Sequence, residues 1–435
     1  MEAFLEIHQN GQWQRAARLR SLADDQCLCE YLAGYVFGDH PTPVSLTFPV
    51  QHGAHAWDDD GLPDRRVPAF LYDMVPQGRG RRFLVDLLGI RDAGDRFVMP
   101  LLLNGAFNPI GCLRIDTAMA FYRRESQSDL EDDGRDGFTL RNIQAKTDDF
   151  LEHMALHAML AAGTTGVQGV APKYLLTQDQ AGRWFADLAL PDERARSHWL
   201  VKLPRGRTAQ DLQVHRNEAA YLSLAAACGV RTLEDPRLVG SMLFVRRFDR
   251  QVTDAGGVVR LHQESLASLV GMRGFGQASS QNALLAAMRR HVSDPFTQTL
   301  EFLRRDVLNL ALRNTDNHAR NTAVQRLGDG TVQLTPLFDF GPMFLDPEVV
   351  PRTMHWRDER GTRQNDWLQV FETLGIDDDE RIRLARALAP FADVVAEIPS
   401  MAADHGVDAF VLEQCRASIE QQAEQLHDLG QAVGA

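Results

Sequence analysis

One stretch, residues 310–344, constrains this chain most, because it holds three cation-binding side chains at fixed intervals. Asp316 is followed five positions later by Asn321, and Asp339 stands in the sequence Asp-Phe-Gly after a short polar turn. Carboxylate and amide oxygens are the ligands that Mg²⁺ prefers in proteins, and a carboxylate beside a hydroxyl can accept its proton. The stretch therefore predicts a site where magnesium holds phosphate groups next to a base.

This spacing is typical of the catalytic loop and the metal-binding segment of protein kinases. It assigns Asp316 as the catalytic base, with Asn321 and Asp339 as the magnesium ligands. His318 lies between the first two residues, either as a group that positions phosphate or nucleotide or as a hydrogen-bonded structural histidine. A polar helix cap is the alternative for Asp316 and Asn321, but it does not account for Asp339.

A phosphate-transfer site also needs a cation, and Lys202 is the candidate. It ends the apolar run 199–201, a pattern similar to the lysine-bearing strand of kinases. Glu218 lies sixteen positions later on a predicted helix, where its carboxylate would hold the ammonium group towards the phosphates. Asp211 and Glu234 are alternative partners, and a surface salt bridge is the other role open to Glu218.

The segment 163–173 is the candidate phosphate cradle. It carries glycines at positions 163, 166 and 169 and ends in Lys173. Glycine permits positive φ angles and close approach, so backbone N–H groups can converge on phosphate oxygens. Since the segment comes one predicted hairpin before Lys202, we interpret it as a loop that covers the phosphates.

Length and composition set the wider limits. A chain of 435 residues exceeds one compact core, so two or three domains are expected. The net charge of -13 argues against a large nucleic-acid surface on this chain alone. Five scattered cysteines predict free thiols in a reducing cytosol. Without a run of about 18 apolar residues or a signal-peptide pattern at the start, we expect a cytoplasmic protein.

Hydrophobic periodicity predicts the elements. The predicted strands are residues 45–50, 111–115, 174–177, 198–204 and 243–249, and the predicted helices are residues 68–88 with an interruption at Pro76, 211–227 and 299–313. We predict an α+β fold, a two-lobed protein-kinase-like arrangement with an extra N-terminal subdomain. Its parts are a β-rich subdomain at 1–130, an ATP-binding N-lobe at 138–250 and an all-α catalytic C-lobe at 251–435.

Further motifs accompany these residues in a fixed order. They are G-V-A-P-K at 169–173, V-K-L-P at 201–204, H-R-N-E at 215–218, R-R-F-D-R at 246–250, R-L-H-Q-E at 260–264, N-T-D-N-H-A-R-N at 314–321 and P-L-F-D at 336–339, preceded by F-L-Y-D-M-V-P at 70–76 and N-P-I-G-C-L at 108–113. The ordered set resembles the HipA family of bacterial serine/threonine kinases, the toxins of type II toxin–antitoxin modules. The resemblance covers nearly the whole chain.

The resemblance implies a Mg-ATP-dependent kinase with Asp316 as base and Asn321 and Asp339 as metal ligands. The ATP-binding residues that it implies are Lys202, Gly166, Gly169, Val170, Lys173, Arg247, Phe248, His318 and Phe338. It further implies a helix-turn-helix antitoxin of the HipB type as partner, with DNA contacted through that complex. The implied substrate is a Ser- or Thr-bearing translation factor such as an aminoacyl-tRNA synthetase.

One departure from the family concerns regulation. A serine before the glycine-rich loop is often autophosphorylated in the family, whereas Gly166 and Gln168 occupy the matching positions here. Thr164 and Thr165 are the nearest hydroxyls and thus the candidate autophosphorylation sites; otherwise the chain lacks this off-switch. Two other functions stay open, a small-molecule kinase of the aminoglycoside or lipid kind and a catalytically silent scaffold for an antitoxin repressor.

Overall fold

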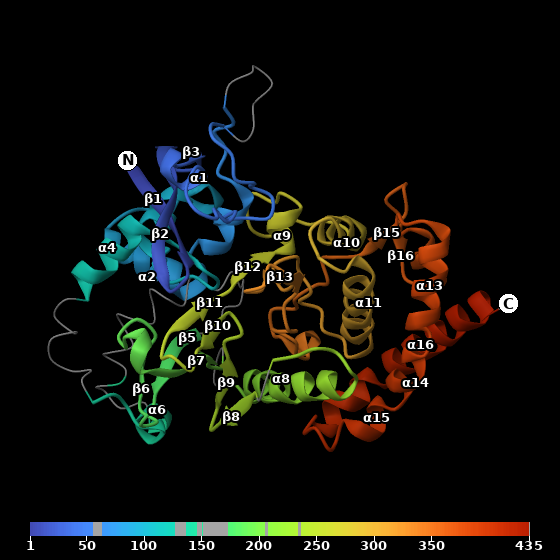
Figure 1. Cartoon of the computed structure of the whole chain (residues 1–435). Helices are drawn as coiled ribbons and strands as arrows, with labels where there is room; N and C mark the ends of the chain where they lie inside the picture. Colours follow the sequence, from blue (N-terminus) through green and yellow to red (C-terminus); the bar gives the residue numbers. More distant parts are fainter. Residues whose placement is uncertain are drawn as a thin grey trace. The chain divides into compact units, whose positions relative to one another are not determined.

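Figure 1 shows the computed structural model, which describes residues 1–54, 63–126, 136–145, 150, 173–204, 208–233 and 236–434. The chain forms two compact units, of which unit 1 comprises Met1–Lys202 and Arg246–Gly276. Unit 2 comprises Leu203–Val245 and Gln277–Ala435. The division into three domains stays a prediction.

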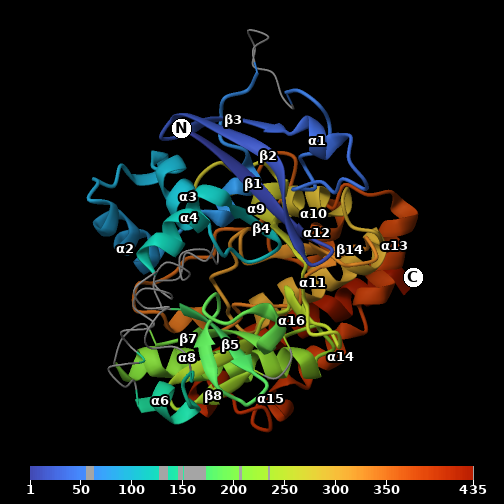
Figure 2. The same cartoon turned by 60° about the vertical axis from the view of Figure 1, so that its left-hand side comes forward.

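A four-stranded antiparallel sheet opens unit 1, in the order β3-β2-β1-β4 (Figure 1 and Figure 2). Its strands are β1 (Glu2–Gln9), β2 (Gln12–Ala23), β3 (Gln26–Tyr31) and β4 (Leu113–Ile115). Asn10 and Gly11 join β1 to β2 with φ angles of 49° and 77°, which the two-residue hairpin turn requires. Alternate residues of β1, namely Ala3, Leu5 and Ile7, are buried and give the sheet its core face.

Short helices complete this N-terminal module. They are α1 (Ala33–Val36), η1 (Ala69–Met74), α2 (Gly78–Leu88), η2 (Gly94–Arg96), α3 (Met99–Gly105) and α4 (Asp116–Glu125). Leu71, Met99 and Phe107 belong to the hydrophobic core that the helices share with the sheet. The predicted helical stretch 68–88 is confirmed as two pieces, η1 and α2, separated at Pro76.

The predicted strand at residues 45–50 is wrong. The chain makes a tight turn there, with an isolated bridge between Ser45 and Phe48. Glu264 is the reason, because its carboxylate accepts hydrogen bonds of 2.8 Å from the Ser45 hydroxyl and from the backbone N–H of Leu46. A backbone donor that a side chain engages in this way is withdrawn from strand pairing.

A second antiparallel sheet of unit 1 carries the two candidate lysines. β5 (Lys173–Asp179) pairs with both β6 (Trp184–Ala186) and β7 (Ala195–Lys202), which confirms the predicted strands at 174–177 and 198–204. The other elements of this unit are α6 (Leu140–Ala145), η3 (Asp192–Arg194), β10 (Arg250–Val252), β11 (Val258–Arg260), β12 (His262–Ser265) and α9 (Leu266–Leu269).

Helices form most of unit 2. They are α8 (Ala209–Ala227), α10 (Gln281–Arg289), α11 (Pro295–Ala311), α12 (Trp367–Glu372), α13 (Asp378–Leu388), α14 (Phe391–Ala396), α15 (Ile398–Met401) and α16 (Ala409–Gly434). The long helix α16 packs along α14 and α11 (Figure 1). α8 and α11 confirm the predicted helices at 211–227 and 299–313. A hairpin of β8 (Arg237–Val239) and β9 (Met242–Arg246) follows α8.

The prediction of an all-α C-terminal lobe is wrong. β13 (Ala323–Arg326) and β14 (Val332–Leu334) form one antiparallel hairpin, and β15 (Trp356–Arg357) and β16 (Arg363–Gln364) form another. In the turn of the first hairpin, Gly330 has a φ of 87° and the Asp329 carboxylate accepts from the Thr331 N–H at 2.9 Å. This turn chemistry favours a hairpin over a helix. The 3₁₀ turn η4 (Met343–Leu345) follows.

Two negative expectations concern the described ranges. No helix there is both long and apolar enough to cross a membrane. The five cysteines, all of which lie in these ranges, are free thiols, as predicted.

Candidate active site

The loop between α11 and β13 carries Asp316 and Asn321, as the sequence predicts. α11 ends at Ala311, and Arg313 then adopts a φ of 53°, the left-handed conformation in which many helices end. Asn314 holds the start of the loop, because its side-chain amide donates to the Asn309 carboxamide oxygen at 2.9 Å. The loop is therefore fixed to the end of α11, with Asp316 half-buried at its centre.

Asn321 and His318 both orient towards Asp316. The Nδ2 of Asn321 donates to the backbone carbonyl of Asp316 at 2.7 Å. The Nδ1 of His318 accepts from the Arg320 N–H at 3.3 Å, which assigns the proton to Nε2, 3.6 Å from the Asp316 Oδ1. Asn321 is 8% exposed, and within the described ranges its Oδ1 has no hydrogen-bond partner.

The β13–β14 hairpin brings the two halves of the site together. Asn321 comes just before β13 and Asp339 follows β14, so an antiparallel pairing returns them to the same end of the hairpin. The pairing extends towards that end, since the Thr335 N–H donates to the Ala323 carbonyl at 2.9 Å. The sequence reading missed this hairpin, which returns Asp339 to the end of β13 at which Asn321 lies. That the three side chains form one site stays a prediction.

The Asp-Phe-Gly segment packs on α8. Asp339 has a φ of 51°, a left-handed conformation that costs a non-glycine residue about 1 kcal/mol or more and is concentrated at functional sites. Phe340 is fully buried, and its ring centroid lies 5.4 Å from that of Tyr221. A Cβ added to Gly341 would lie 3.6 Å from the Glu218 Cβ. Glu218 therefore lies beside this segment.

Asp211 and Glu234 are the alternatives to Glu218 as partners of Lys202. Asp211 belongs to the capping box of α8, where it exchanges hydrogen bonds with Thr208. Its carboxylate is thus committed to the helix N-terminus. Glu234 lies outside the described residues. In the same H-R-N-E motif, the His215 Nε2 accepts a hydrogen bond from the Leu243 N–H at 3.1 Å. Glu218 is the only carboxylate of this motif.

In unit 1, Lys173 and Lys202 occupy directly opposed positions of β5 and β7. They are 5% and 7% exposed and are two of only three lysines in the whole sequence. Like charges at opposed positions disfavour a sheet, so a buried lysine pair suits a site that receives an anion. The predicted loop residues Gly166, Gly169 and Val170, and the candidate hydroxyls Thr164 and Thr165, lie outside the described residues.

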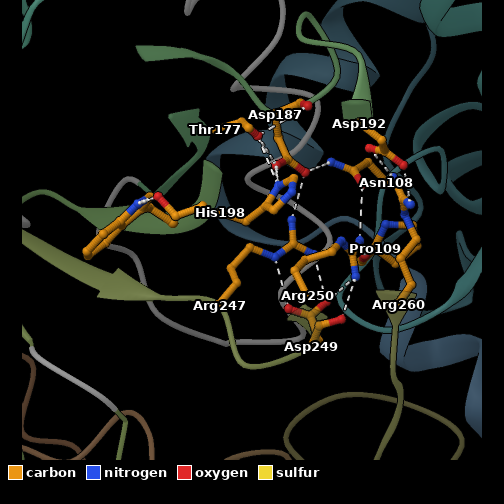
Figure 3. Close-up of polar contacts among 12 residues, drawn as sticks. Asn108, Pro109, Thr177, Asp187, Asp192, His198, Arg247, Asp249, Arg250 and Arg260 are labelled. Atoms are coloured by element: carbon orange, nitrogen blue, oxygen red, sulfur yellow. Dashed lines mark hydrogen bonds and ion pairs between the residues drawn. The ribbon is translucent and has the colours of Figure 1, made fainter. Parts of the chain in front are cut away.

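Arg247 belongs to a buried charge network, which Figure 3 shows. Its guanidinium donates to Asp187 at 2.8 Å and to both oxygens of Asp249 at 3.0 and 2.8 Å. The Asp187 carboxylate also contacts the His198 Nδ1 at 2.8 Å (Figure 3). The guanidinium is therefore engaged within the protein. Phe248 and Phe338 are half-buried, and the nucleotide contacts of all three residues stay predictions.

The same network reaches the N-P-I-G segment of the N-terminal module. Asn108 donates to Asp187 at 2.7 Å (Figure 3). The Gly111 N–H donates to Asp249 at 2.8 Å, and Arg250 donates to the Gly111 carbonyl at 2.7 Å. Gly111 has a φ of 98°, and an added Cβ would lie 3.3 Å from the Gln263 nitrogen. This position therefore requires glycine.

The carboxylates of this network are ionised. Burial alone would raise the pKa of Asp187, but the Arg247 guanidinium and His198 hold that pKa well below its ordinary value. Burial likewise opposes ionisation of Asp249, but Arg247 and Arg250 together hold the pKa of this carboxyl well below its ordinary value. Sequence reasoning missed the network, although the motifs N-P-I-G and R-R-F-D-R contain five of its members.

Two family models match the chain. The HipA N-terminal domain matches residues 5–115, and the HipA-like C-terminal domain matches residues 165–402. Their succession defines a protein in which a HipA-type N-terminal module precedes a larger HipA-like domain. The chain belongs to the HipA family.

Individual relatives agree with this assignment. The chain is similar to two kinase-named proteins of Sinorhizobium fredii, Y4mE at 29% identity over 38% of this chain and Y4dM at 24% over 63%. These matches span 40% and 61% of the relatives' lengths. The structure matches HipA of Shewanella oneidensis MR-1, solved with HipB and operator DNA, at a TM-score of 0.64 and 17% identity, over 98% and 99% of the two chains. This last match shows a shared fold.

Proposed function

We propose that this chain is a Mg-ATP-dependent protein kinase that phosphorylates serine or threonine. One observation carries the proposal: the amide of Asn321 is locked by its bond to Asp316, which leaves a buried Oδ1 at the hairpin end to which Asp339 also returns. An oriented amide oxygen beside a carboxylate fits magnesium. The fold of helices and antiparallel sheets, the kinase-named relatives and the family membership support the same function.

Asn321 and Asp339 would hold the metal. Within the described ranges no three His, Cys, Asp or Glu side chains cluster as a metal cage. Magnesium usually takes one or two protein carboxylates and completes its shell with water and phosphate oxygens. When bound, the ion neutralises charge on the phosphates of ATP.

The chain's own residues would do the rest. Asp316, steadied by His318 and Asn321, would orient the substrate hydroxyl and accept its proton. Lys173 and Lys202 would bind the phosphates, and the segment around Phe248 would contact adenine. This division of labour is mostly positioning and charge stabilisation, which is what phosphoryl transfer requires.

We further propose that the chain is the toxin of a toxin–antitoxin pair. The Shewanella relative was solved with HipB and operator DNA, which supports a HipB-type helix-turn-helix antitoxin as partner here. DNA contact would come through that complex, consistent with this chain's net charge of -13. A cytoplasmic translation factor such as an aminoacyl-tRNA synthetase is the proposed substrate.

The decisive experiment incubates the purified protein with Mg²⁺ and γ-labelled ATP, first with bacterial lysate and then with individual synthetases. We expect label on Ser or Thr of a lysate protein, transferred roughly 100-fold or more slowly by Asp316→Asn. Label transferred only to aminoglycosides or lipids would redefine the enzyme as a small-molecule kinase. ATP binding without transfer to any acceptor would favour the scaffold. Mass spectrometry of the kinase itself tests Thr164 and Thr165.

A further inference from the structure

We propose that Asn317 is a positioning residue that holds the catalytic loop, through Gln281 and Arg352, to a buried carboxylate of α11, Asp306. The proposal rests on the proposed function, because it explains how Asp316 is kept in place. All five residues belong to unit 2.

Asp306 is the fixed point of this arrangement. It is 2% exposed, and its carboxylate accepts three hydrogen bonds from elsewhere in the chain. Gln281 Nε2 donates at 3.0 Å, Arg352 Nη2 at 2.6 Å and Trp356 Nε1 at 2.8 Å. A carboxylate this deeply buried is tolerated because a guanidinium and two neutral donors satisfy it. The position of Gln281 and Arg352 is therefore set from α11.

Asn317 accepts hydrogen bonds from the same two residues, Gln281 and Arg352. Its side-chain oxygen accepts from Arg352 Nη1 at 3.3 Å, from Arg352 Nη2 at 3.2 Å and from Gln281 Nε2 at 3.2 Å. The amide is assigned in this orientation because the reverse would point its NH₂ group at three donors. Asn317 directly follows Asp316, so anchoring its side chain fixes the backbone that carries the candidate base.

Arg352 connects the catalytic loop to the chain beyond Asp-Phe-Gly. It lies eleven residues after Gly341, and its Nε donates to the Met354 carbonyl at 3.0 Å. One residue further along, the His355 carbonyl accepts from the Gln281 N–H at 2.9 Å. Folding of the segment 352–356 against α10 and α11 thus also builds the clamp on Asn317. We infer that the segment 352–356 and the backbone of Asp316 become ordered together.

The simplest competing role for these residues is stability alone, and kinetics separate the two. A displacement of about 1 Å at a reacting group can lower a rate about 100-fold, while binding of ATP by the other unit's lysines is untouched. A positioning role therefore predicts a loss of kcat with little change of KM for ATP. A stability role predicts a lower unfolding temperature with normal turnover of the folded fraction.

The test uses the full chain with Asn317→Ala, Arg352→Gln and the double variant, and Arg357→Gln as the matched control. Arg357 is bonded through its guanidinium to the Gly361 carbonyl in the exposed β15–β16 turn. We expect roughly 10- to 100-fold lower kcat for each single variant, with KM for ATP within two-fold. The double variant should lose little more than Asn317→Ala alone, because Asn317→Ala already removes the oxygen to which Arg352 donates. The control should retain wild-type kcat.

Hydrogen exchange provides a readout that is independent of activity. Peptides covering residues 314–321 should take up deuterium faster in Asn317→Ala and Arg352→Gln than in the wild type. Wild-type kcat and unchanged exchange in Asn317→Ala would overturn the proposal, as would multiplicative losses in the double variant. If the wild-type protein itself transfers no phosphate, the proposed function fails, and the exchange rates alone decide whether Asn317 holds the loop.

Discussion

The side-chain amide of Asn321 donates to the backbone carbonyl of Asp316 across 2.7 Å, so a single hydrogen bond sets two candidate site residues relative to each other. The donor end of the amide is used for the loop, and the acceptor end is left for a ligand. An aspartate at this position would lack the donor, and a lysine would lack the acceptor.

Replacing Asp316 by asparagine should lower phosphoryl transfer by roughly 100-fold or more, because it removes the base and keeps the shape. Initial rates with labelled ATP measure the effect. Asp329→Asn is the matched control, since Asp329 lies in the exposed turn between β13 and β14. Transfer at the wild-type rate by Asp316→Asn would remove Asp316 from its proposed role.

Two substitutions at Asn321 separate its two ends. Asn321→Ala should weaken Mg-ATP binding and lower kcat, because it deletes the metal oxygen and the bond to the Asp316 carbonyl. Asn321→Asp keeps an oxygen for the metal, so Mg-ATP binding should recover while kcat stays low. Calorimetric titration with Mg-ATP, beside initial rates, distinguishes them. Equal Mg-ATP affinity in the alanine variant and the wild type would argue against a metal ligand.

The opposed lysines permit a direct chemical test. An acyl phosphate of ATP transfers its acyl group to a nearby lysine amine and releases ATP. We expect acylation of Lys202 and Lys173 that excess ATP suppresses, whereas labelling of Lys146, the third lysine, should be insensitive to ATP. Peptide mass spectrometry identifies the modified residue. Equal labelling of all three lysines, with or without ATP, would contradict the phosphate-binding role.

Glu264 predicts a pH dependence of stability. Burial raises its pKa to about 7, against the hydrogen bonds from Ser268, Leu46 and Ser45, which lower it. A carboxyl whose pKa is higher in the folded state binds more protons there, so its stabilising contribution is complete below the unfolded-state pKa of about 4.5 and is lost as pH rises through about 7. Folding of the wild type should therefore weaken across this range.

Glu264→Gln should remove this dependence. The glutamine NH₂ group can donate to the two serine hydroxyls, and its oxygen can accept from the Leu46 N–H, so the hydrogen bonds are retained. Denaturant unfolding of both proteins between pH 4.5 and 8 measures the difference. His8, whose pKa burial lowers to about 4, titrates in both proteins and cancels. A constant difference across this range would show that Glu264 does not titrate there.

Local signals predicted part of this molecule. The Asp316 loop, α8 and α11 follow from polar spacing and helical periodicity, both of which lie within short windows of sequence. The Asn10-Gly11 turn was an equally local signal for the β1–β2 hairpin and could have been used. The apolar alternation at 45–50 was misleading, because the group that decides the conformation there, Glu264, is more than two hundred positions away.

The remaining contacts depend on partners that no local pattern connects. Arg247 meets Asp187 sixty positions earlier, and Asp306 meets Arg352 forty-six positions later. The facing of Lys173 and Lys202 depends on strand register, which one sequence does not fix when both faces of a sheet carry apolar residues. Motif membership identified some of these residues, but it gave no sign that the Arg247 guanidinium bonds internally to Asp187 and Asp249.

The bonds from Asn108 and Gly111 to Asp187, Asp249 and Arg250 also bear on how this chain can be shortened. In a fragment that begins after the N-terminal module, ionised groups that are buried in the whole protein would lose these hydrogen-bond partners. Leaving a buried donor or acceptor without its hydrogen-bond partner costs about 1–3 kcal/mol, and more for a charged group, which is a large share of a domain's stability. A minimal version of this protein would therefore keep the segment 108–111 rather than begin after the N-terminal module.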